Sequence, residues 1–106
     1  MFNLYIDDER YPRTDRNWTI ARNAFQAKHL VTTNGVPDYI SFDHDLGEGE
    51  TGYDFAKWLL EYLNDNDLTL PENFDYNVHS ANPVGAKNIA ALMDFVKVHF
   101  HSEKDK

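Results

Sequence analysis

Four short apolar runs alternate with amphipathic stretches along this chain of 106 residues. The runs predict β-strands, because they are short, rich in aromatic and β-branched residues, and end in polar residues. The predicted strands are Phe2–Asp7, Trp18–Ala21, Tyr39–Asp43 and Asp75–Ser80. Helical patterns precede the third strand, link it to the fourth, and follow the fourth. This alternation favours a parallel α/β layered domain.

Capping signals mark the starts of three predicted helices. Asn23 can cap a helix from Ala24 to about Thr33, which Asn34-Gly35 ends. The segment 51–54 (Thr-Gly-Tyr-Asp) has the pattern of a capping box, and Asn82-Pro83 places a proline at the first position of the last helix. Apolar residues recur at helical spacing in the last two helices, at Phe55, Leu59, Tyr62 and Leu63 and at Ile89, Leu92, Met93, Val96 and Phe100.

The connection between the first two strands does not fit a regular α/β repeat. It has about ten residues, the short limit for a parallel crossover through a helix. The second strand therefore either follows a tight irregular loop or lies antiparallel at the edge of the sheet.

Three of the predicted strands end in acidic or hydroxyl-bearing residues. They are followed or closed by Asp7-Asp8, by Asp43-His44-Asp45 and by His79-Ser80. In an open parallel sheet, ligands bind in the crevice outside the carboxyl ends of the strands, so these residues are expected to converge. Clustered carboxylates are unfavourable unless a cation or shared protons neutralise them. The pattern predicts a phosphate site that depends on Mg²⁺ (or Mn²⁺).

Each of these polar strand ends also has a simpler interpretation. Aspartate is common where strands stop, so Asp7 and Asp8 can be turn residues. If the third strand continues, Asp43 and Asp45 point to one face and His44 to the other. Adjacent strand residues point to opposite faces, so only one of the pair His79-Ser80 is expected to face the site.

Phosphate-binding candidates come from basic residues and a helix start. Arg22 closes the second strand, and guanidinium matches phosphate bidentately. Asn82 begins a helix whose N-terminus attracts anions, and Lys87 lies one turn further on. Arg10 and Arg13 in the first loop are weaker candidates. The alternatives are a surface ion pair for Arg22, a plain N-cap for Asn82 and a solvated charge for Lys87.

Composition limits the partners. With 10 basic against 18 acidic residues, the net charge of −8 argues against binding along an extended nucleic-acid backbone. A phosphorylated small molecule or the end of an RNA suits this charge better. The chain has no cysteine, no signal-peptide pattern and no apolar stretch near 18 residues, so a cytoplasmic protein with no membrane contact is expected. Residues 1–106 are expected to form a single domain, with a frayed tail at 101–106.

Several of these motifs resemble the receiver domains of response regulators. The shared features are Asp7-Asp8 after the first strand, Asp43 after the third, Gly52-Tyr53 opening a helix, and Ser80 after the fourth strand. The chain departs from that pattern because nothing follows the last helix that could be a fifth strand with its phosphate-binding lysine. The first connection is also too short for the usual helix.

A closer resemblance covers nearly the whole chain. Its segments are similar to the cyclic-phosphate processing receiver-like domains of bacteria and phages. The two most specific segments are Asp43-His44-Asp45-Leu46-Gly47 and His79-Ser80-Ala81-Asn82-Pro83-Val84-Gly85; Tyr5 to Arg10, Trp18 to Arg22 and Thr51 to Asp54 also match. The resemblance implies action on cyclic phosphates of nucleotides or RNA ends.

Pattern and resemblance together predict a compact receiver-like (flavodoxin-like) three-layer sandwich. It would have about four mostly parallel strands, helices on both faces and no fifth strand. In this interpretation Asp7, Asp8 and Asp43 hold the metal, directly or through water.

The predicted activity is metal-dependent hydrolysis or transfer at a phosphodiester. Asp45 or His79 would act as general base or acid, with Ser80, Arg22 and the helix starting at Pro83 on the phosphate oxygens. One alternative makes Asp43 a covalent nucleophile, as in true receivers. Another is a non-catalytic pseudo-receiver that senses a phosphorylated ligand or binds a protein partner.

Overall fold

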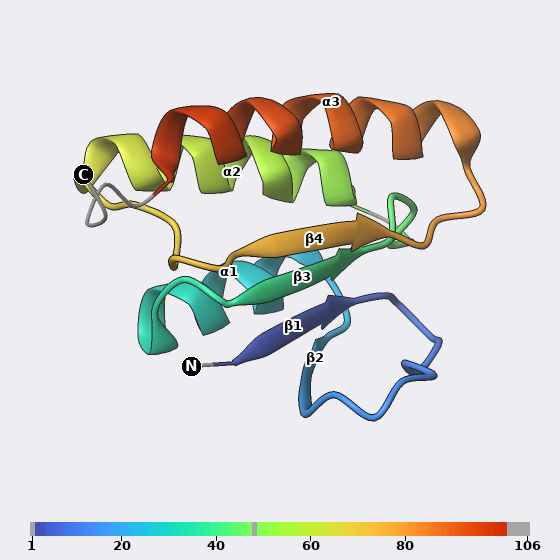
Figure 1. Ribbon diagram of the computed structural model, residues 1–106. Coiled ribbons are helices and arrows are strands. Elements are labelled where there is room, and N and C mark those ends of the chain that lie inside the picture. Colours follow the sequence, from blue (N-terminus) through green and yellow to red (C-terminus); the bar gives the residue numbers. More distant parts are fainter. Residues whose placement is uncertain (1, 48, 102–106) are drawn as a thin grey trace.

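A parallel β-sheet and three α-helices make up the structure, a computed structural model that describes residues 2–47 and 49–101 (Figure 1). The strands are β1 (Asn3–Ile6), β2 (Trp18–Ala21), β3 (Tyr39–Phe42) and β4 (Asp75–Val78). The helices are α1 (Ala24–Asn34), α2 (Gly52–Asp65) and α3 (Pro83–Phe100). The elements predicted from the pattern are all present, with bounds that differ by at most two residues.

The four strands lie in the order β2-β1-β3-β4, and each neighbouring pair is parallel. The parallel α/β class is therefore confirmed. For β2, the irregular-loop alternative is correct: the strand follows a loop without a helix and still runs parallel to β1 at the edge. Because all four strands point the same way, their carboxyl ends meet at one edge of the sheet (Figure 1).

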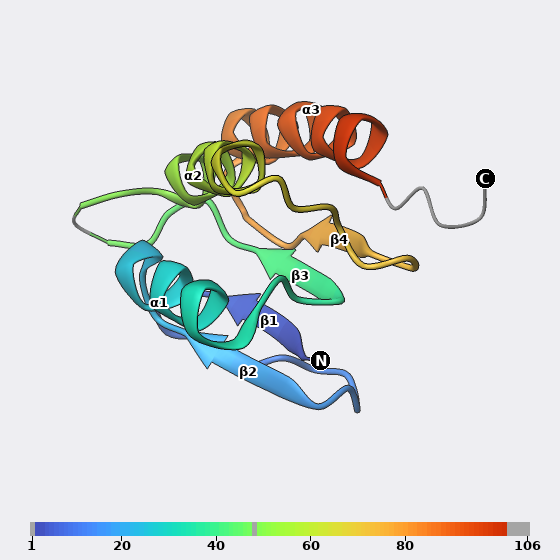
Figure 2. The same cartoon turned by 90° about the vertical axis from the view of Figure 1, so that its left-hand side faces the viewer.

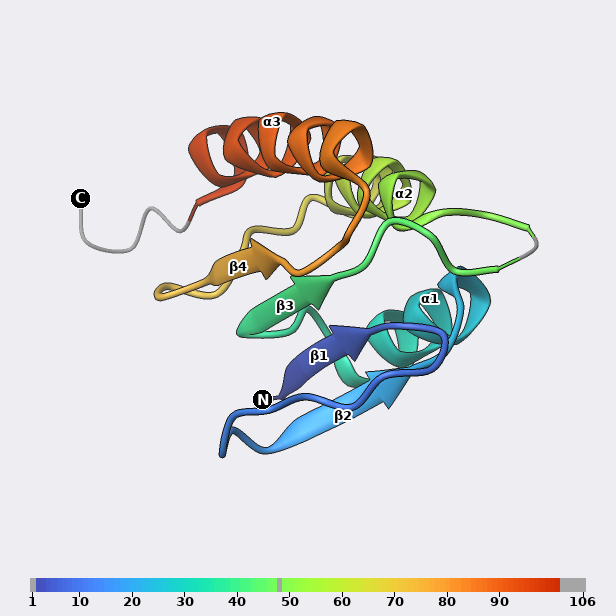
Figure 3. The ribbon, with the colours of Figure 1, turned by 90° about the vertical axis from the view of Figure 1, so that its right-hand side faces the viewer.

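The layering differs from the expected three-layer sandwich, because all three helices cover the same face of the sheet (Figures 2 and 3). Helix α1 packs against α2, and α2 packs against α3. The connections from β2 to β3 and from β3 to β4 cross the sheet in the same direction, so right-handed crossovers place α1 and α2 on one side. The connection from β1 to β2 contains no helix, and among the described residues this loop is the segment that lies beside the opposite face.

The core lies between the sheet and its helices. Leu4 and Ile6 of β1 and Ile40 and Phe42 of β3 are fully buried there. Their neighbours Tyr5 and Ser41 point to the helix-free face, as the strand period of two requires. We call this second surface the open face of the sheet.

Hydrogen bonds in its C-terminal half attach α3 to β4 and to the segment that precedes β4. The hydroxyl of Tyr76 in β4 donates to the Asp94 carboxylate at 2.7 Å, and burial together with this bond raises the pKa of Tyr76. At the far end the Leu70 N–H donates to the Phe100 carbonyl at 2.7 Å. Of the tail predicted to be frayed, residues 102–106 lie outside the described residues.

No helix in the described part of the chain is long and apolar enough to cross a membrane.

Candidate functional site

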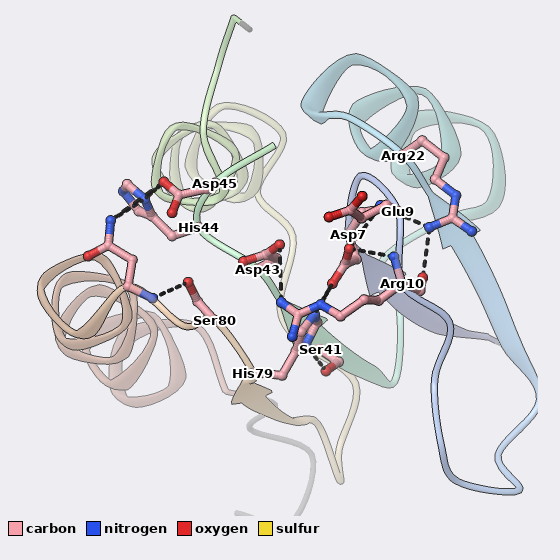
Figure 4. Close-up of polar contacts among 11 residues, drawn as sticks. Asp7, Glu9, Arg10, Arg22, Ser41, Asp43, His44, Asp45, His79 and Ser80 are labelled. Atoms are coloured by element: carbon pink, nitrogen blue, oxygen red, sulfur yellow. Dashed lines mark hydrogen bonds and ion pairs between the residues drawn. The ribbon is translucent and has the colours of Figure 1, made fainter. Parts of the chain in front are cut away.

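Three side chains at equivalent positions of adjacent strands form a buried acidic cluster (Figure 4). Asp7, Asp43 and His79 each follow the last residue of a strand, β1, β3 and β4. The sheet ladder continues through their backbones, because Asp43 N–H donates to the Ile6 carbonyl at 3.0 Å and His79 N–H to the Phe42 carbonyl at 2.9 Å. One carboxylate oxygen from each aspartate and one imidazole nitrogen lie within 4.8 Å of one another. This group can hold a metal ion.

Asp7 is held as a carboxylate by the loop that follows it. Its Oδ1 accepts from the backbone N–H groups of Glu9 at 2.9 Å and Arg10 at 2.8 Å. Burial acts to raise the pKa of Asp7, but these N–H groups, the His79 ring and the Arg10 guanidinium together lower it below its usual value. Asp7 therefore stays ionised although its side chain is fully buried.

Arg10 lies between the two carboxylates. Its Nε is 3.0 Å from Asp7 Oδ2, and its Nη2 is 3.6 Å from Asp43 Oδ2. Arg22 holds the loop that follows β1, since its Nη1 donates to the carbonyls of Asp7 at 3.0 Å and Arg10 at 2.7 Å. Arg22, predicted as a phosphate clamp, thus lies against the backbone of the loop, and Arg10 places its charge on the cluster.

Ser41 links His79 to the middle of the sheet. The Ser41 hydroxyl is 2.7 Å from His79 Nδ1, and His79 Nε2 is 3.0 Å from Asp7 Oδ2. The ring also stacks on Tyr5, with centroids 4.6 Å apart. A hydroxyl can donate or accept, so Ser41 supports either neutral tautomer of His79. Sequence reasoning missed Ser41, although a serine between two buried apolar strand residues is an unusual core residue.

The other predicted carboxylates lie outside the cluster. Asp8 is exposed, and with Glu9, Asp43 and Asp45 it lines an open crevice of about 540 Å³ at the carboxyl edge of the sheet. Asp45 is exposed too, because β3 ends at Phe42 and the chain turns away after Asp43. The condition for Asp43 and Asp45 to share a face, a continuing strand, is therefore not met.

The remaining predicted residues organise the start of α3. Asn82 caps this helix by accepting from Gly85 N–H at 2.9 Å, and Ser80 Oγ accepts from Asn82 N–H at 3.1 Å. Asp45 pairs with His44 Nδ1 at 3.0 Å, a hydrogen bond that lowers the pKa of Asp45. Lys87 is exposed on α3. Of these residues Asp45 lines the crevice, and Ala81, between Ser80 and Asn82, lines it too.

Two glycines let the loop after β3 lie close to the helices. A Cβ atom at Gly52 would overlap the carbonyl oxygen of Asp43, and one at Gly85 would overlap the His44 ring. Gly52 N–H also donates to the His44 carbonyl at 2.9 Å. The glycines of the Thr51–Asp54 and Asn82–Gly85 motifs therefore fix where Asp43 and His44 lie.

Comparison with known proteins agrees with this geometry. Residues 2–95 match the model of one family, the cyclic-phosphate processing receiver domain. No curated protein and no solved structure gives a significant match. The family match covers most of the chain, including every residue of the cluster. The chain therefore belongs to the cyclic-phosphate processing receiver domains.

Proposed function

We propose that this domain is a metal-dependent phosphoesterase that acts on cyclic phosphates of nucleotides or RNA ends. The observation that carries the proposal is the buried group Asp7, Asp43 and His79 at the carboxyl ends of three adjacent strands. Open α/β sheets bind their ligands at this edge. Family membership supports the substrate class.

The donor set fits a divalent cation. Asp7 is held ionised and supplies a carboxylate oxygen, as does Asp43. His79 can present the lone pair of Nε2 if its Nδ1–H donates to Ser41, the arrangement that ligating histidines usually adopt. A bound cation supplies Lewis-acid neutralisation of phosphate oxygens. Two oxygens and one imidazole nitrogen suit Mn²⁺ better than Mg²⁺, which favours all-oxygen sites.

Other residues of the chain are assigned to phosphate binding and proton transfer. Arg10 lies beside both carboxylates with half of its side chain exposed, so it is placed to contact a phosphate in the crevice. Asp45 lines the same crevice and is the candidate general base, because His79 is committed to the metal group. Ser80 and the first turn of α3 are placed to bind phosphate oxygens.

Contacts within the cluster favour the second candidate, a non-catalytic ligand sensor. Arg10 pairs with both carboxylates, and His79 Nε2 lies 3.0 Å from Asp7 Oδ2, so every member of the cluster has a polar partner within the chain. A sensor of this kind would bind a phosphorylated ligand and release it unchanged.

The deciding experiment is a substrate screen followed by phosphorus NMR. 2′,3′-Cyclic nucleotides, cyclic oligonucleotides and RNA with a cyclic-phosphate end are incubated with the protein and Mn²⁺ or Mg²⁺. We expect an opened phosphate from at least one of them, and loss of most of this activity for Asp43→Asn, which removes a carboxylate of the metal group. Asp65→Asn, an exposed carboxylate at the far end of α2, is the matched control. Unchanged ligand after Mn²⁺-dependent binding would establish the sensor instead.

A further inference from the structure

A cavity of about 470 Å³ lies on the open face of the sheet, beneath the loop between β1 and β2. Its size falls in the range of small-ligand pockets, roughly 300–1,000 Å³. Figure 3 shows that helices α1, α2 and α3 lie on the other side of the sheet, which leaves room for this cavity on the open face. It is distinct from the acidic crevice at the carboxyl edge.

The floor of the cavity is aromatic. Tyr5, Trp18 and Tyr39 come from β1, β2 and β3, and their rings meet edge to face, with centroids 5.5 Å apart for Tyr5 and Trp18 and 5.9 Å for Trp18 and Tyr39. Adjacent strands thus bring three aromatic rings together, with planes inclined by 67° between Tyr5 and Trp18 and by 73° between Trp18 and Tyr39. Aromatic side chains in a cationic groove bind nucleobases by stacking.

The rim of the cavity is cationic. The chain has four arginines, and three of them, Arg10, Arg13 and Arg16, line the cavity. The described lining includes no aspartate or glutamate, in a chain with 18 of them. The guanidinium of Arg16 lies 4.0 Å from the centroid of the Tyr39 ring, in a cation–π contact. This charge segregation favours an anionic ligand with an aromatic ring.

The cavity and the metal group share side chains. His79 and Arg10 line the cavity and also contact Asp7. The His79 ring, a member of the metal group, stacks on Tyr5, so the aromatic floor and the metal group are in direct contact. A ligand with its aromatic ring on the floor can therefore extend its phosphate towards Arg10.

We infer that the open-face cavity binds the nucleoside of a nucleoside phosphate, with the base on the Tyr5-Trp18-Tyr39 floor and the phosphate towards the arginines. The inference rests on the proposed function, which supplies the reaction. It adds the place at which the base of the substrate is recognised. Asn77 lines the cavity and makes no side-chain hydrogen bond to the described residues, so its amide is free to pair with a base edge. The same chemistry is offered by a free nucleotide and by the last nucleotide of an RNA.

Calorimetry in EDTA tests the inference without metal or turnover. The probes are AMP, 2′,3′-cyclic AMP, a short RNA with a 2′,3′-cyclic-phosphate end, and the base-free anions ribose 5-phosphate and inorganic phosphate. We expect the base-containing probes to bind about tenfold or more tightly than the base-free anions, the usual scale of base stacking. Tighter binding of the RNA than of the mononucleotides would identify RNA ends as the source, and the reverse order free nucleotides.

Variants locate the binding. Arg13→Ala and Tyr39→Leu should each weaken AMP binding about tenfold, whereas Lys57→Ala, which removes an exposed cation on α2, should not. As an independent readout, Trp58→Phe leaves Trp18 as the single tryptophan, and AMP should quench its fluorescence. Equal affinity for AMP and ribose 5-phosphate, or full AMP affinity in both cavity variants, would overturn the inference.

The two proposals fail separately. Turnover of a cyclic phosphate without base-dependent binding would refute the cavity assignment and leave the enzyme proposal standing. Base-dependent binding in the cavity without turnover of any screened substrate would refute the enzyme proposal and leave the cavity assignment standing.

Discussion

At the scale of single residues, the two ring nitrogens of His79 have different partners, Ser41 Oγ and Asp7 Oδ2. If Nε2–H donates to Asp7, the Ser41 hydroxyl donates to Nδ1. If Nδ1–H donates to Ser41, Nε2 has a free lone pair beside two carboxylates. The second tautomer is unfavourable next to Asp7 alone and favourable with a cation between them. Ser41 is thus a positioning residue, because its hydroxyl can pair with either neutral tautomer of His79, the one suited to the empty site and the one suited to a bound cation.

Ser41→Ala tests this role. Loss of the hydroxyl removes the partner that orients His79, and we expect Mn²⁺ affinity to fall about 10–100-fold. Calorimetric titration with Mn²⁺ measures the change, and circular dichroism checks the fold. Thr32→Ala, which removes an exposed hydroxyl bonded to its own helix, is the control. Mn²⁺ affinity equal to that of the parent would assign Ser41 to packing alone.

At the scale of elements, α2 and α3 position the loop after β3 through close backbone approaches. Gly52 begins α2 against the Asp43 carbonyl, and Gly85 in the first turn of α3 faces the His44 ring. A helix start that carried a side chain at either position would push Asp43 or His44 away. The glycines are therefore required by contact, since neither has a positive φ angle.

Gly85→Ala is expected to destabilise the fold, although alanine is the better helix former by about 1 kcal/mol. The added methyl overlaps His44, and overpacking of this kind costs about 1–3 kcal/mol in the free energy of unfolding. Urea denaturation gives the value.

Two comparisons isolate the cause. Ala91→Gly, at an exposed position of α3, should lose about 0.5–1 kcal/mol and measures the intrinsic helix preference. The double variant Gly85→Ala/His44→Ala should recover most of the loss. A net stabilisation by Gly85→Ala alone would show that His44 moves freely.

At the scale of the whole molecule, charge is separated between two neighbouring surfaces. The crevice at the carboxyl edge is lined by Asp8, Glu9, Asp43 and Asp45, and the cavity on the open face is lined by arginines. Arg10 lines both. A cation and an anion can therefore bind side by side, each in a field of opposite sign.

Metal binding should stabilise the entire domain, because Asp7, Asp43 and His79 come from three separate strands and converge only in the fold. With Mn²⁺ at a hundred times its dissociation constant, the free energy of unfolding should rise by about 2.7 kcal/mol. Thermal denaturation with Mn²⁺ and with EDTA measures this gain. Asp65→Asn should keep it and Asp43→Asn should lose it. An equal rise in Asp43→Asn would mean that the ion binds elsewhere.

The sequence by itself determined the elements and the edge at which polar residues meet. Asp7, Asp43 and His79 each close a short apolar run, and parallel strands bring such ends together whatever the details of packing. The caps at Asn23 and Asn82 and the capping box at Thr51 were also readable, because each depends on residues within one turn.

Tertiary structure decided the layering, the partners within the cluster and the existence of the open-face cavity. Helices cover one face because both helical crossovers run in one direction, and strand order is not encoded locally. Ser41 meets His79 across 38 positions of sequence, a contact that only strand register creates. The loop after β1 brings Arg10 onto both carboxylates because Asp7 binds its backbone and Arg22 holds it from the next strand. These contacts depend on long-range geometry, which spacing along the chain does not contain.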